Sequence, residues 1–453
     1  MKQIKSVSGI RGILNKSLFL EDISLYVRSF SKIQKNNNLP VLLARDSRTT
    51  GKEITSHIVK QLTDIGRDII DCDIIPTPTA QYITQEFEIA GAIVVTASHN
   101  PSEWNGLKFI DSNGIFLNNI TNKKLIELST KKNTKKKRND NFKKGKVSSY
   151  KEAINLHIDN ILNLSFINIE KIKSRNFKII LDTINGASCK GFKILLEKIN
   201  CEIIHINDKP NGIFDRNPEP KVENILHLSE IVKDNNADLA FVTDPDGDRL
   251  AMIDEKGEVI IEENTIVLCA LNFLRSSQDN KPIITNLSTT SALEDVANKY
   301  NIDVIRTPVG EINVVNEMLN NDSNFGGEGN GGIILKESHY GRDAFVGCIM
   351  ILDFLSKENI HLSSANKQIP KYHMLKEKID ILSEINFEEL ANDFYKKYPN
   401  SNFDFRDGLK ITEPHFWAHI RKSNTEPIVR IYIESKEKKI TQIILSELKS
   451  FLN

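Results

Sequence analysis

The chain has no excess of charge of either sign and no long apolar run. Its 453 residues carry 60 Lys and Arg against 60 Asp and Glu, so the formal net charge is zero. Proteins that bind nucleic acid or an anionic membrane surface usually carry excess positive charge, and we expect neither partner. No apolar run approaches the ~20 residues that span a bilayer, and the first residues lack the apolar core of a signal peptide.

Cysteine is also scarce. The chain has five, and none forms a Cys-x-x-Cys pair: Cys72, Cys189, Cys201, Cys269 and Cys348. An odd, scattered set is typical of reduced thiols and not of a disulfide framework or a zinc site. Together with the missing signal peptide, this predicts a cytoplasmic protein.

The hydrophobic pattern predicts four domains. Strands and helices alternate through three similar α/β units, and the last segment has the order of an α+β unit. We place the domains at residues 1–146, 147–256, 257–370 and 371–453. The basic tract Lys131–Lys146 contains Phe142 as its one aromatic residue and lies between two folded patterns, so we interpret it as a solvated linker and not as a nucleic-acid site.

The stretch Thr96–Pro101 follows the apolar run Ala92–Val95, which reads as a buried strand. Ser98 and His99 therefore fall on a loop at the carboxyl end of a strand, where open α/β sheets place ligands. Lys108 follows ten residues after Ser98. A hydroxyl, an imidazole and an amine suit a nucleophile, a proton shuttle and an anion clamp. The alternative is a turn that caps the strand, with His and Lys in solvent.

Three carboxylates alternate along one predicted loop, at Asp244, Asp246 and Asp248. They repel one another unless a cation neutralises them, and an all-oxygen set suits Mg²⁺ before Ca²⁺. An EF-hand is excluded because Arg249 stands where that loop needs Gly, and because strands flank the loop. A plain acidic turn is the weaker alternative.

The glycine-rich stretch Gly327–Gly332 formally matches the dinucleotide pattern G-x-G-x-x-G. The context excludes that site, since the glycines precede an apolar strand and open no helix. We interpret the stretch as a loop that exposes Glu328 and Asn330 to sugar hydroxyls, with a flexible hairpin as the alternative.

The segment Arg421–Pro427 offers hydroxyls, an amide and successive backbone N–H groups in a turn, a composition that binds phosphate. Arg430 alternates with Val429 and Ile431 on the next strand, so its side chain lies on a different face from theirs. A metal loop, a Ser–His–Lys loop and a phosphate nest together indicate phosphoryl transfer on a small molecule held at both ends.

These four motifs resemble, in order and spacing, those of the α-D-phosphohexomutases. Ser8–Gly12 and Ala44–Gly51 are similar to the family's N-terminal signatures, and the likeness covers the whole chain. The sequence of these motifs, including Ser338–Asp343, is most similar to that of bacterial phosphoglucosamine mutases. The resemblance implies four domains around a central cleft, a phosphosugar substrate, and a monomer or homodimer.

The resemblance also implies roles for individual residues. Ser98 would carry the phosphoryl group and, with Asp244, Asp246 and Asp248, hold Mg²⁺. The metal and Arg11 or Arg249 would neutralise phosphate charge, and His99 and Lys108 would be candidates for proton transfer and phosphate contact near Ser98. Glu328 and Asn330 would read sugar hydroxyls. The non-reacting phosphate would lie on Arg421, Ser423, Asn424, Thr425 and Arg430.

The reaction so implied converts glucosamine 6-phosphate to glucosamine 1-phosphate, for UDP-N-acetylglucosamine and cell-wall synthesis. Its intermediate and activator would be glucosamine 1,6-bisphosphate. Two positions depart from the family pattern: Asn330 stands where Ser is common, and Ile312 where a basic residue is common. A phosphomannomutase/phosphoglucomutase is therefore the alternative.

Overall fold

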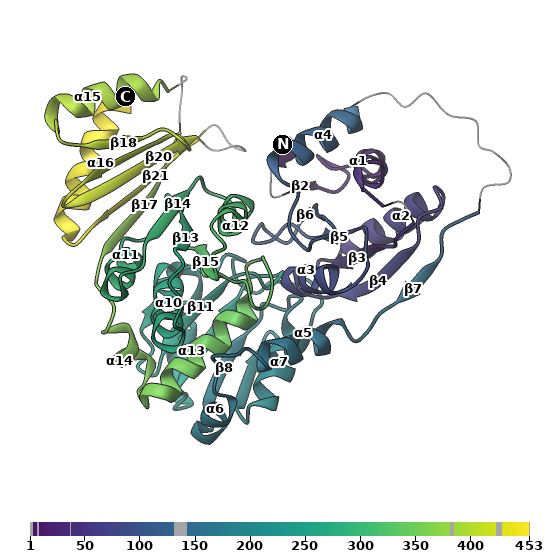
Figure 1. Ribbon diagram of the computed structural model, residues 1–453, viewed down its shortest axis with the longest axis horizontal. Coiled ribbons are helices and arrows are strands. Elements are labelled where there is room, and N and C mark those ends of the chain that lie inside the picture. The colour runs from purple at the N-terminus through teal and green to yellow at the C-terminus, as the bar shows by residue number, and fades with distance from the viewer. Residues whose placement is uncertain are drawn as a thin grey trace.

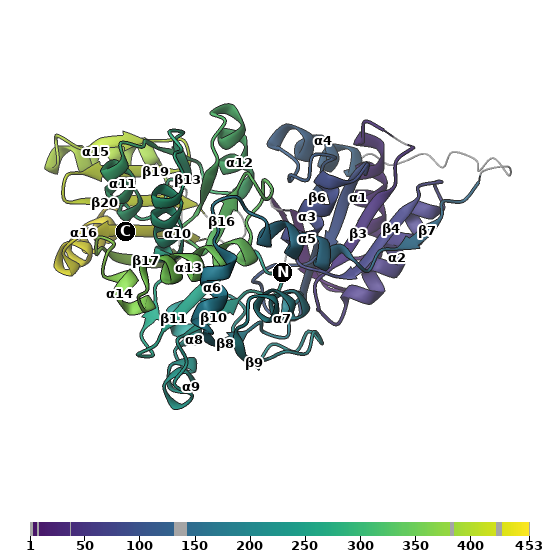
Figure 2. The same cartoon turned by 60° about the horizontal axis from the view of Figure 1, so that its bottom comes forward.

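The computed structural model describes residues 3–6, 9–36, 38–130, 143–380, 385–422 and 428–452. Their strands form four sheets of seven, five, four and five strands, and each sheet uses strands that are consecutive in the sequence. Figures 1 and 2 show the four units following one another through the molecule, from the purple first unit to the yellow last one. Three α/β units and a final α+β unit are the architecture that the sequence predicts.

The first sheet has the order β1-β2-β6-β5-β3-β4-β7. Its central strands β3, β4 and β5 run parallel, as the strand–helix–strand pattern indicates. The strands are β1 (Ile4–Ser6), β2 (Gly9–Ile13), β3 (Val41–Arg45), β4 (Ile69–Ile74), β5 (Gly91–Val95), β6 (Trp104–Ile110) and β7 (Val147–Ser149). The helices are α1 (Leu20–Ile33), α2 (Gly51–Thr63), α3 (Thr77–Glu86) and α4 (Asn119–Thr130). Every residue of β5 is buried, which explains its apolar composition.

The second sheet has the order β12-β11-β10-β8-β9. Its strands are β8 (Lys178–Asp182), β9 (Glu202–Ile206), β10 (Leu239–Thr243), β11 (Leu250–Asp254) and β12 (Val259–Ile260). Its helices are α5 (Ala153–Leu162), α6 (Ile169–Arg175), α7 (Cys189–Lys198), α8 (Val222–Ile225) and α9 (Leu228–Asp234). The carboxyl end of β10 leads directly into the acidic loop.

The third sheet has the order β14-β13-β15-β16. Its strands are β13 (Ile283–Asn286), β14 (Val304–Thr307), β15 (Phe325–Glu328) and β16 (Gly332–Leu335). Its helices are α10 (Glu263–Ser276), α11 (Ala292–Ala297), the 3-10 helix η1 (Asn298–Tyr300), α12 (Glu311–Asn320), α13 (Ala344–Glu358) and α14 (Leu362–Asn366). Helix α13 packs against α5, α6 and α7, and one hydrophobic core extends from the first unit through the second and third.

The fourth sheet is antiparallel, with the order β17-β21-β20-β19-β18. Its strands are β17 (His373–Asp380), β18 (Asn402–Asp404), β19 (Leu409–Glu413), β20 (Phe416–Lys422) and β21 (Ile428–Ser435). Helices α15 (Phe387–Lys397) and α16 (Lys438–Leu452) pack on it around a separate apolar core.

Two short strands lie beyond the domain limits that the sequence suggests. Strand β7 starts at Val147 and pairs with β4 of the first sheet, and β12 starts at Val259 and pairs with β11 of the second. Most of the basic tract, residues 131–142, lies outside the described residues. Among the helices that are described, none is long and apolar enough to cross a membrane.

Candidate active site

The Ser98 loop leaves β5 through a tight turn. Ser98 has a positive φ of 50°, in the left-handed region that residues other than Gly rarely adopt and that is frequent at functional sites. Its backbone N–H donates to Thr96 Oγ1 at 2.9 Å, so the capping turn considered as an alternative is present. Ser98 Oγ nevertheless points at two ionisable side chains: it lies 3.3 Å from His99 Nδ1 and 3.3 Å from Asp244 Oδ2.

The side chain of Arg48 holds this loop through hydrogen bonds to its carbonyl oxygens. Its fully buried guanidinium donates to the carbonyl oxygens of Ser98 and Asn100, both at 2.6 Å, to that of Trp104 at 2.9 Å, and to that of Pro101. Its Nε donates to Asp46 Oδ2 at 2.9 Å. The carbonyls of a tight loop cannot pair with one another, and Arg48 supplies the donors they need.

The acidic loop follows β10, and its three carboxylates are fully buried. Asp244 Oδ1 accepts the backbone N–H groups of Asp248 and Arg249, which leaves its Oδ2 toward Ser98. Asp246 Oδ1 and Asp248 Oδ1 are buried without a hydrogen-bond partner among the described residues. One oxygen from each of the three lies within 4.8 Å of the others. Converging oxygens that lack donors fit a hard divalent cation such as Mg²⁺.

The other oxygens of the acidic loop bind protein donors. Lys108 Nζ lies 2.6 Å from Asp246 Oδ2 and 3.2 Å from Asp248 Oδ2. Thr77, the first residue of α3, donates from Oγ1 to Asp246 Oδ2 at 2.6 Å. The first domain thus fixes the acidic loop of the second domain from two directions.

Burial and charge shift the ionisation of this group. Burial, with Asp248 and Asp246 nearby, raises the pKa of Asp244 well above its usual value. The pKa of Asp248 is lowered despite burial, by Arg342, Lys108 and Arg249. Burial and the charge of Arg249 lower the pKa of His99, which favours a neutral imidazole beside Ser98.

Two arginines of the cleft come from different domains. Arg11 on β2 donates to Asn100 Oδ1 at 2.8 Å, and burial lowers its pKa to about 10. Arg249 donates to Glu219 Oε1 at 3.1 Å and lies next to Asp248. Both side chains line the cleft that contains Ser98.

The glycine-rich stretch spans the end of β15 and the turn to β16. Glu328 is 2% exposed and is held at both oxygens: Asn286 Nδ2 and the Gly310 N–H donate to Oε1, and Arg342 Nη1 and Asn330 Nδ2 donate to Oε2. Glu328 and Asn330 both line the cleft. Ile312, one of the two departures from the family pattern, does not: its side chain is 3% exposed and packs in the apolar core.

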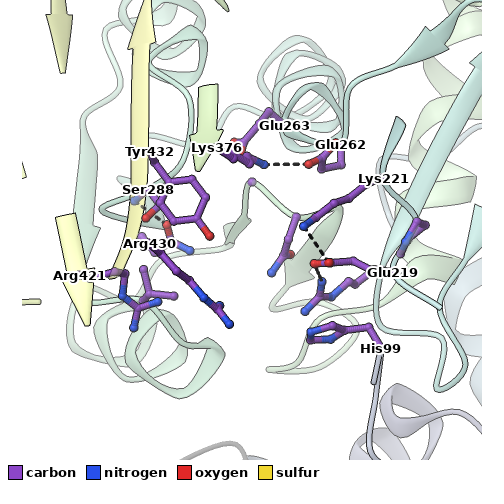
Figure 3. A pocket seen from close by; sticks show the side chains of 16 residues that line it. His99, Glu219, Lys221, Glu262, Glu263, Ser288, Lys376, Arg421, Arg430 and Tyr432 are labelled. Carbon is purple, nitrogen blue, oxygen red and sulfur yellow. Dashed lines mark hydrogen bonds and ion pairs between the residues drawn. The ribbon is translucent and has the colours of Figure 1, made fainter. Parts of the chain in front are cut away.

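The fourth domain closes the cleft with two arginines. Arg421 on β20 and Arg430 on β21 are directly opposite one another, and the neighbours Val429 and Ile431 are buried, as the alternation predicts. Figure 3 shows these arginines on one side of the cavity, with His99 and Glu219 on the other. Ser423, Asn424 and Thr425 lie outside the described residues.

One cleft therefore brings together residues from all four domains. It is lined by Arg11, Ser98, His99, Lys108, Arg249, Glu311, Glu328, Asn330, Arg342, Arg421 and Arg430. An adjoining cavity extends from it along the third and fourth domains, past Ser288, Tyr432 and Lys376. There Lys376 binds Glu262 and Glu263, and burial raises the pKa of Glu263 to about 7.

Comparison with known sequences assigns all four domains. The models of the phosphoglucomutase/phosphomannomutase α/β/α domains I, II and III match residues 2–137, 155–257 and 262–372, and that of the C-terminal domain matches residues 384–449. The chain belongs to the α-D-phosphohexomutase family. This phosphohexomutase is accordingly an isomerase that transfers a phosphoryl group within its substrate.

Its relatives align from end to end. It is 29% identical to a phosphoglucosamine/phosphogalactosamine mutase of Sulfurisphaera tokodaii, over 100% of this chain and 99% of the relative. It is 32% identical to a phosphoglucomutase/phosphomannomutase of Thermococcus kodakarensis, over 96% and 95%. A phosphoglucomutase/phosphomannomutase family protein of Burkholderia thailandensis shares the fold, with a TM-score of 0.85 at 22% identity over 99% and 97% of the chains.

Sequence reasoning missed several residues that build this site: Arg48, Thr77, Glu219, Glu311 and Arg342. Arg48 and Thr77 stand just after β3 and β4, at the sheet edge where Ser98 follows β5. That position was a usable signal, because ligands gather at the carboxyl ends of parallel strands. Glu311 and Arg342 become site residues only through contacts between distant segments.

Proposed function

We propose that this phosphohexomutase interconverts glucosamine 6-phosphate and glucosamine 1-phosphate through a phosphoserine at Ser98. The observation that carries the proposal is the position of Ser98 Oγ. It lies 3.3 Å from Asp244 Oδ2 of the acidic loop, in the same cleft as Arg421 and Arg430. A phosphate on Ser98 and a phosphate on the two arginines would face one sugar from opposite ends.

Asp244, Asp246 and Asp248 are the residues that would hold Mg²⁺, with Ser98 beside them. Bound there, the ion would neutralise charge on the phosphate oxygens. Arg11 and Arg249 add positive charge from the cleft wall. Lys108 stays on Asp246 and Asp248, where it balances the charge of the acidic loop.

The transfer itself is a substitution at phosphorus. The sugar hydroxyl attacks phospho-Ser98, the Ser98 Oγ–P bond breaks, and a sugar O–P bond forms. His99, neutral because its pKa is lowered, is suited to accept the hydroxyl proton and to pass a proton to the departing Ser98 Oγ, 3.3 Å from its Nδ1, so that Ser98 ends as a free hydroxyl. The 1,6-bisphosphate then turns end for end, and Ser98 Oγ takes the other phosphoryl group.

The relatives support a hexosamine substrate and also name the alternative. The Sulfurisphaera tokodaii relative is a phosphoglucosamine/phosphogalactosamine mutase, whereas the Thermococcus kodakarensis relative is a phosphoglucomutase/phosphomannomutase. Five free thiols, four of them buried, fit the proposed cytoplasmic location.

The test compares kcat/KM for glucosamine, glucose and mannose 6-phosphates, with Mg²⁺ and the matching 1,6-bisphosphate supplied. We expect glucosamine 6-phosphate to be preferred and Ser98→Ala to be inactive. A preference for mannose or glucose 6-phosphate would establish the alternative. Full activity of Ser98→Ala would refute the phosphoserine, and release of free phosphate at the mutase rate would indicate a phosphatase.

A further inference from the structure

Arg342 connects the sugar-facing and metal-facing parts of the cleft. Its Nη2 donates to Asp248 Oδ2 at 2.7 Å, its Nη1 to Glu328 Oε2 at 2.7 Å and its Nε to Glu311 Oε2 at 3.0 Å. The three carboxylates come from the acidic loop, the end of β15 and the start of α12. The planar fork of a guanidinium can serve three such acceptors at once, and a Lys ammonium cannot reproduce that geometry.

Gly332 provides the space for this side chain. A Cβ at position 332 would lie 2.2 Å from Arg342 Cδ and 2.9 Å from its Cγ, both closer than atoms can approach. Gly332 does not have a left-handed backbone, so alanine fits its conformation and conflicts only with neighbouring side chains. The absence of a side chain here is what admits Arg342 to the cleft.

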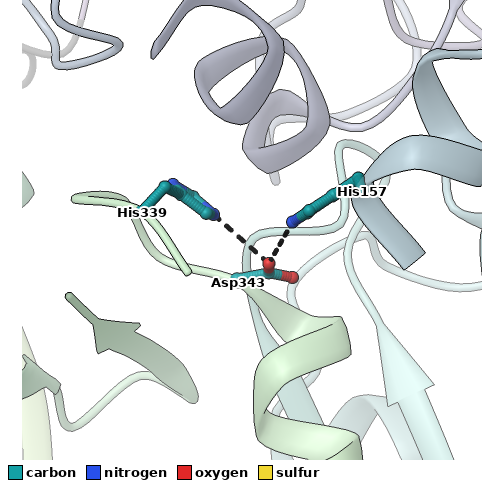
Figure 4. A group of neighbouring side chains, drawn as sticks. All are labelled: His157, His339 and Asp343. Atoms are coloured by element: carbon teal, nitrogen blue, oxygen red, sulfur yellow. Dashed lines mark hydrogen bonds and ion pairs between the residues drawn. The ribbon is translucent and has the colours of Figure 1, made fainter. Parts of the chain in front are cut away.

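The backbone next to Arg342 is anchored by a buried cluster. Figure 4 shows His157 and His339 both directed at Asp343, with Nε2 atoms 3.0 and 3.2 Å from Asp343 Oδ2. Asp343 Oδ1 accepts the Phe345 N–H at the start of α13. Thr79 Oγ1, on α3, lies 3.0 Å from His157 Nδ1, so the cluster joins three domains. Asp343 thus lies between two imidazoles and the first turn of α13, and these contacts fix the backbone beside Arg342.

Arg342 also determines how Glu328 can meet a ligand. Four donors surround the Glu328 carboxylate, and the one from Asn330 is the longest at 3.2 Å. Asn330 is half-buried and lines the cleft, so its amide is the donor that a sugar hydroxyl can replace. The bond from Arg342 then keeps Oε2 in place while the exchange occurs.

We propose that Arg342 is a positioning residue for sugar recognition, which fixes the Glu328 carboxylate against the acidic loop in the space that Gly332 leaves open. The inference rests on the proposed function, because it takes Glu328 as a reader of sugar hydroxyls.

The test measures binding of a hexose 6-phosphate and of its monodeoxy analogues to the full-length protein by calorimetry. The variants are Arg342→Lys, which keeps the charge, and Gly332→Ala, which keeps every donor and acts mainly on the Arg342 stem, with a milder contact of 3.1 Å to Asn330 Oδ1. In the wild type, the analogue that lacks the hydroxyl donating to Glu328 should bind about 10-fold or more weakly than the parent sugar, as expected for a lost hydrogen bond to a charged group. Both variants should bind the parent sugar about 10-fold more weakly and lose most of that discrimination.

Arg175→Lys is the matched control. Arg175, on α6, also donates to several oxygens, those of Leu355, Asn359 and Ile360, but it contacts no residue of the cleft. A general loss of packing would appear equally in the control, whereas loss of hydroxyl discrimination would not. In a double-mutant cycle the effects of Arg342→Lys and Gly332→Ala should not add, since both act on one contact.

Wild-type discrimination in a folded Gly332→Ala or Arg342→Lys protein would overturn the proposal. Gly332→Ala keeps the test decisive if Arg342→Lys does not fold. If the wild type binds the sugar phosphate but does not isomerise it, the proposed function fails, and the binding constants still decide the role of Arg342.

Discussion

Replacing Arg48 with methionine should release the Ser98 loop from the body of the first domain. Arg48→Met preserves most of the buried side-chain volume but removes the guanidinium donors that hold the loop. The change takes the guanidinium from the carbonyls of Ser98, Asn100, Pro101 and Trp104, of which that of Ser98 is buried and the others are partly buried.

The magnitude follows from these contacts. An unsatisfied buried group costs about 1–3 kcal/mol, and breaking a buried ion pair from one side costs about 3–5 kcal/mol. Because the loop can move toward water, we expect about 3–5 kcal/mol in local stability. Arg48→Met also leaves the buried Asp46 carboxylate without its cation, although the backbone of residue 48 and Thr96 still donate to it. Removing that charge with Asp46→Asn in addition to Arg48→Met should therefore recover part of the loss.

Hydrogen exchange, read peptide by peptide, measures this effect where it occurs. Backbone amides of residues 96–107 should exchange at least about 100-fold faster in Arg48→Met, while those of the fourth domain stay unchanged. The occupancy of phosphoserine at Ser98, read by mass spectrometry, should fall in parallel. Wild-type exchange across residues 96–107 in a folded Arg48→Met protein would refute the assignment of Arg48 as the support of the loop.

Three further predictions concern other parts of the molecule. Burial lowers the pKa of His419 to about 4, so the unfolded chain takes up this proton first. Stability is then full above the ordinary pKa of about 6.5 and is lost as the pH falls toward 4, by about 2 kcal/mol at pH 5; denaturant unfolding should show this loss in the wild type and not in His419→Gln. Mg²⁺ at 100 times its dissociation constant should raise the free energy of unfolding by about 2.7 kcal/mol, and calorimetry should find this gain missing in Asp246→Asn. Gly191→Ala places a Cβ 2.3 Å from Phe345 Cζ, which should cost about 1–3 kcal/mol in thermal unfolding and leave KM unchanged.

The parts of the site that the sequence predicts are those whose residues lie close together in the sequence. Ser98 stands after an apolar strand, and the three acidic residues stand within five positions of one another, so a short window contains the whole pattern. The four-unit fold follows in the same way from alternating strands and helices. The alternation around Arg430 correctly separates its side chain from the buried ones of Val429 and Ile431.

The residues that escaped prediction act over long separations. Arg342 meets Asp248 across 94 positions of sequence, and Arg48 meets the Ser98 carbonyl across 50. No local periodicity encodes such contacts. That of Arg342 with Asp248 depends on how the second and third domains dock, and that of Arg48 depends on the assembly of the first domain. Ile312 illustrates the converse: it departs from a family pattern, yet its side chain is buried in the core and does not reach the cleft.

The placement of Arg421 and Arg430 on the last sheet has a consequence for biosynthesis. A chain emerging from the ribosome completes the Ser98 loop and the acidic loop well before these arginines are made. Domains fold as units during synthesis, starting from the N-terminus. A nascent chain with three finished domains still lacks the two strands that carry Arg421 and Arg430, the residues proposed to hold the distal phosphate. On the proposed function, the unfinished enzyme would not retain a phosphosugar, and turnover would begin only when the final sheet has formed.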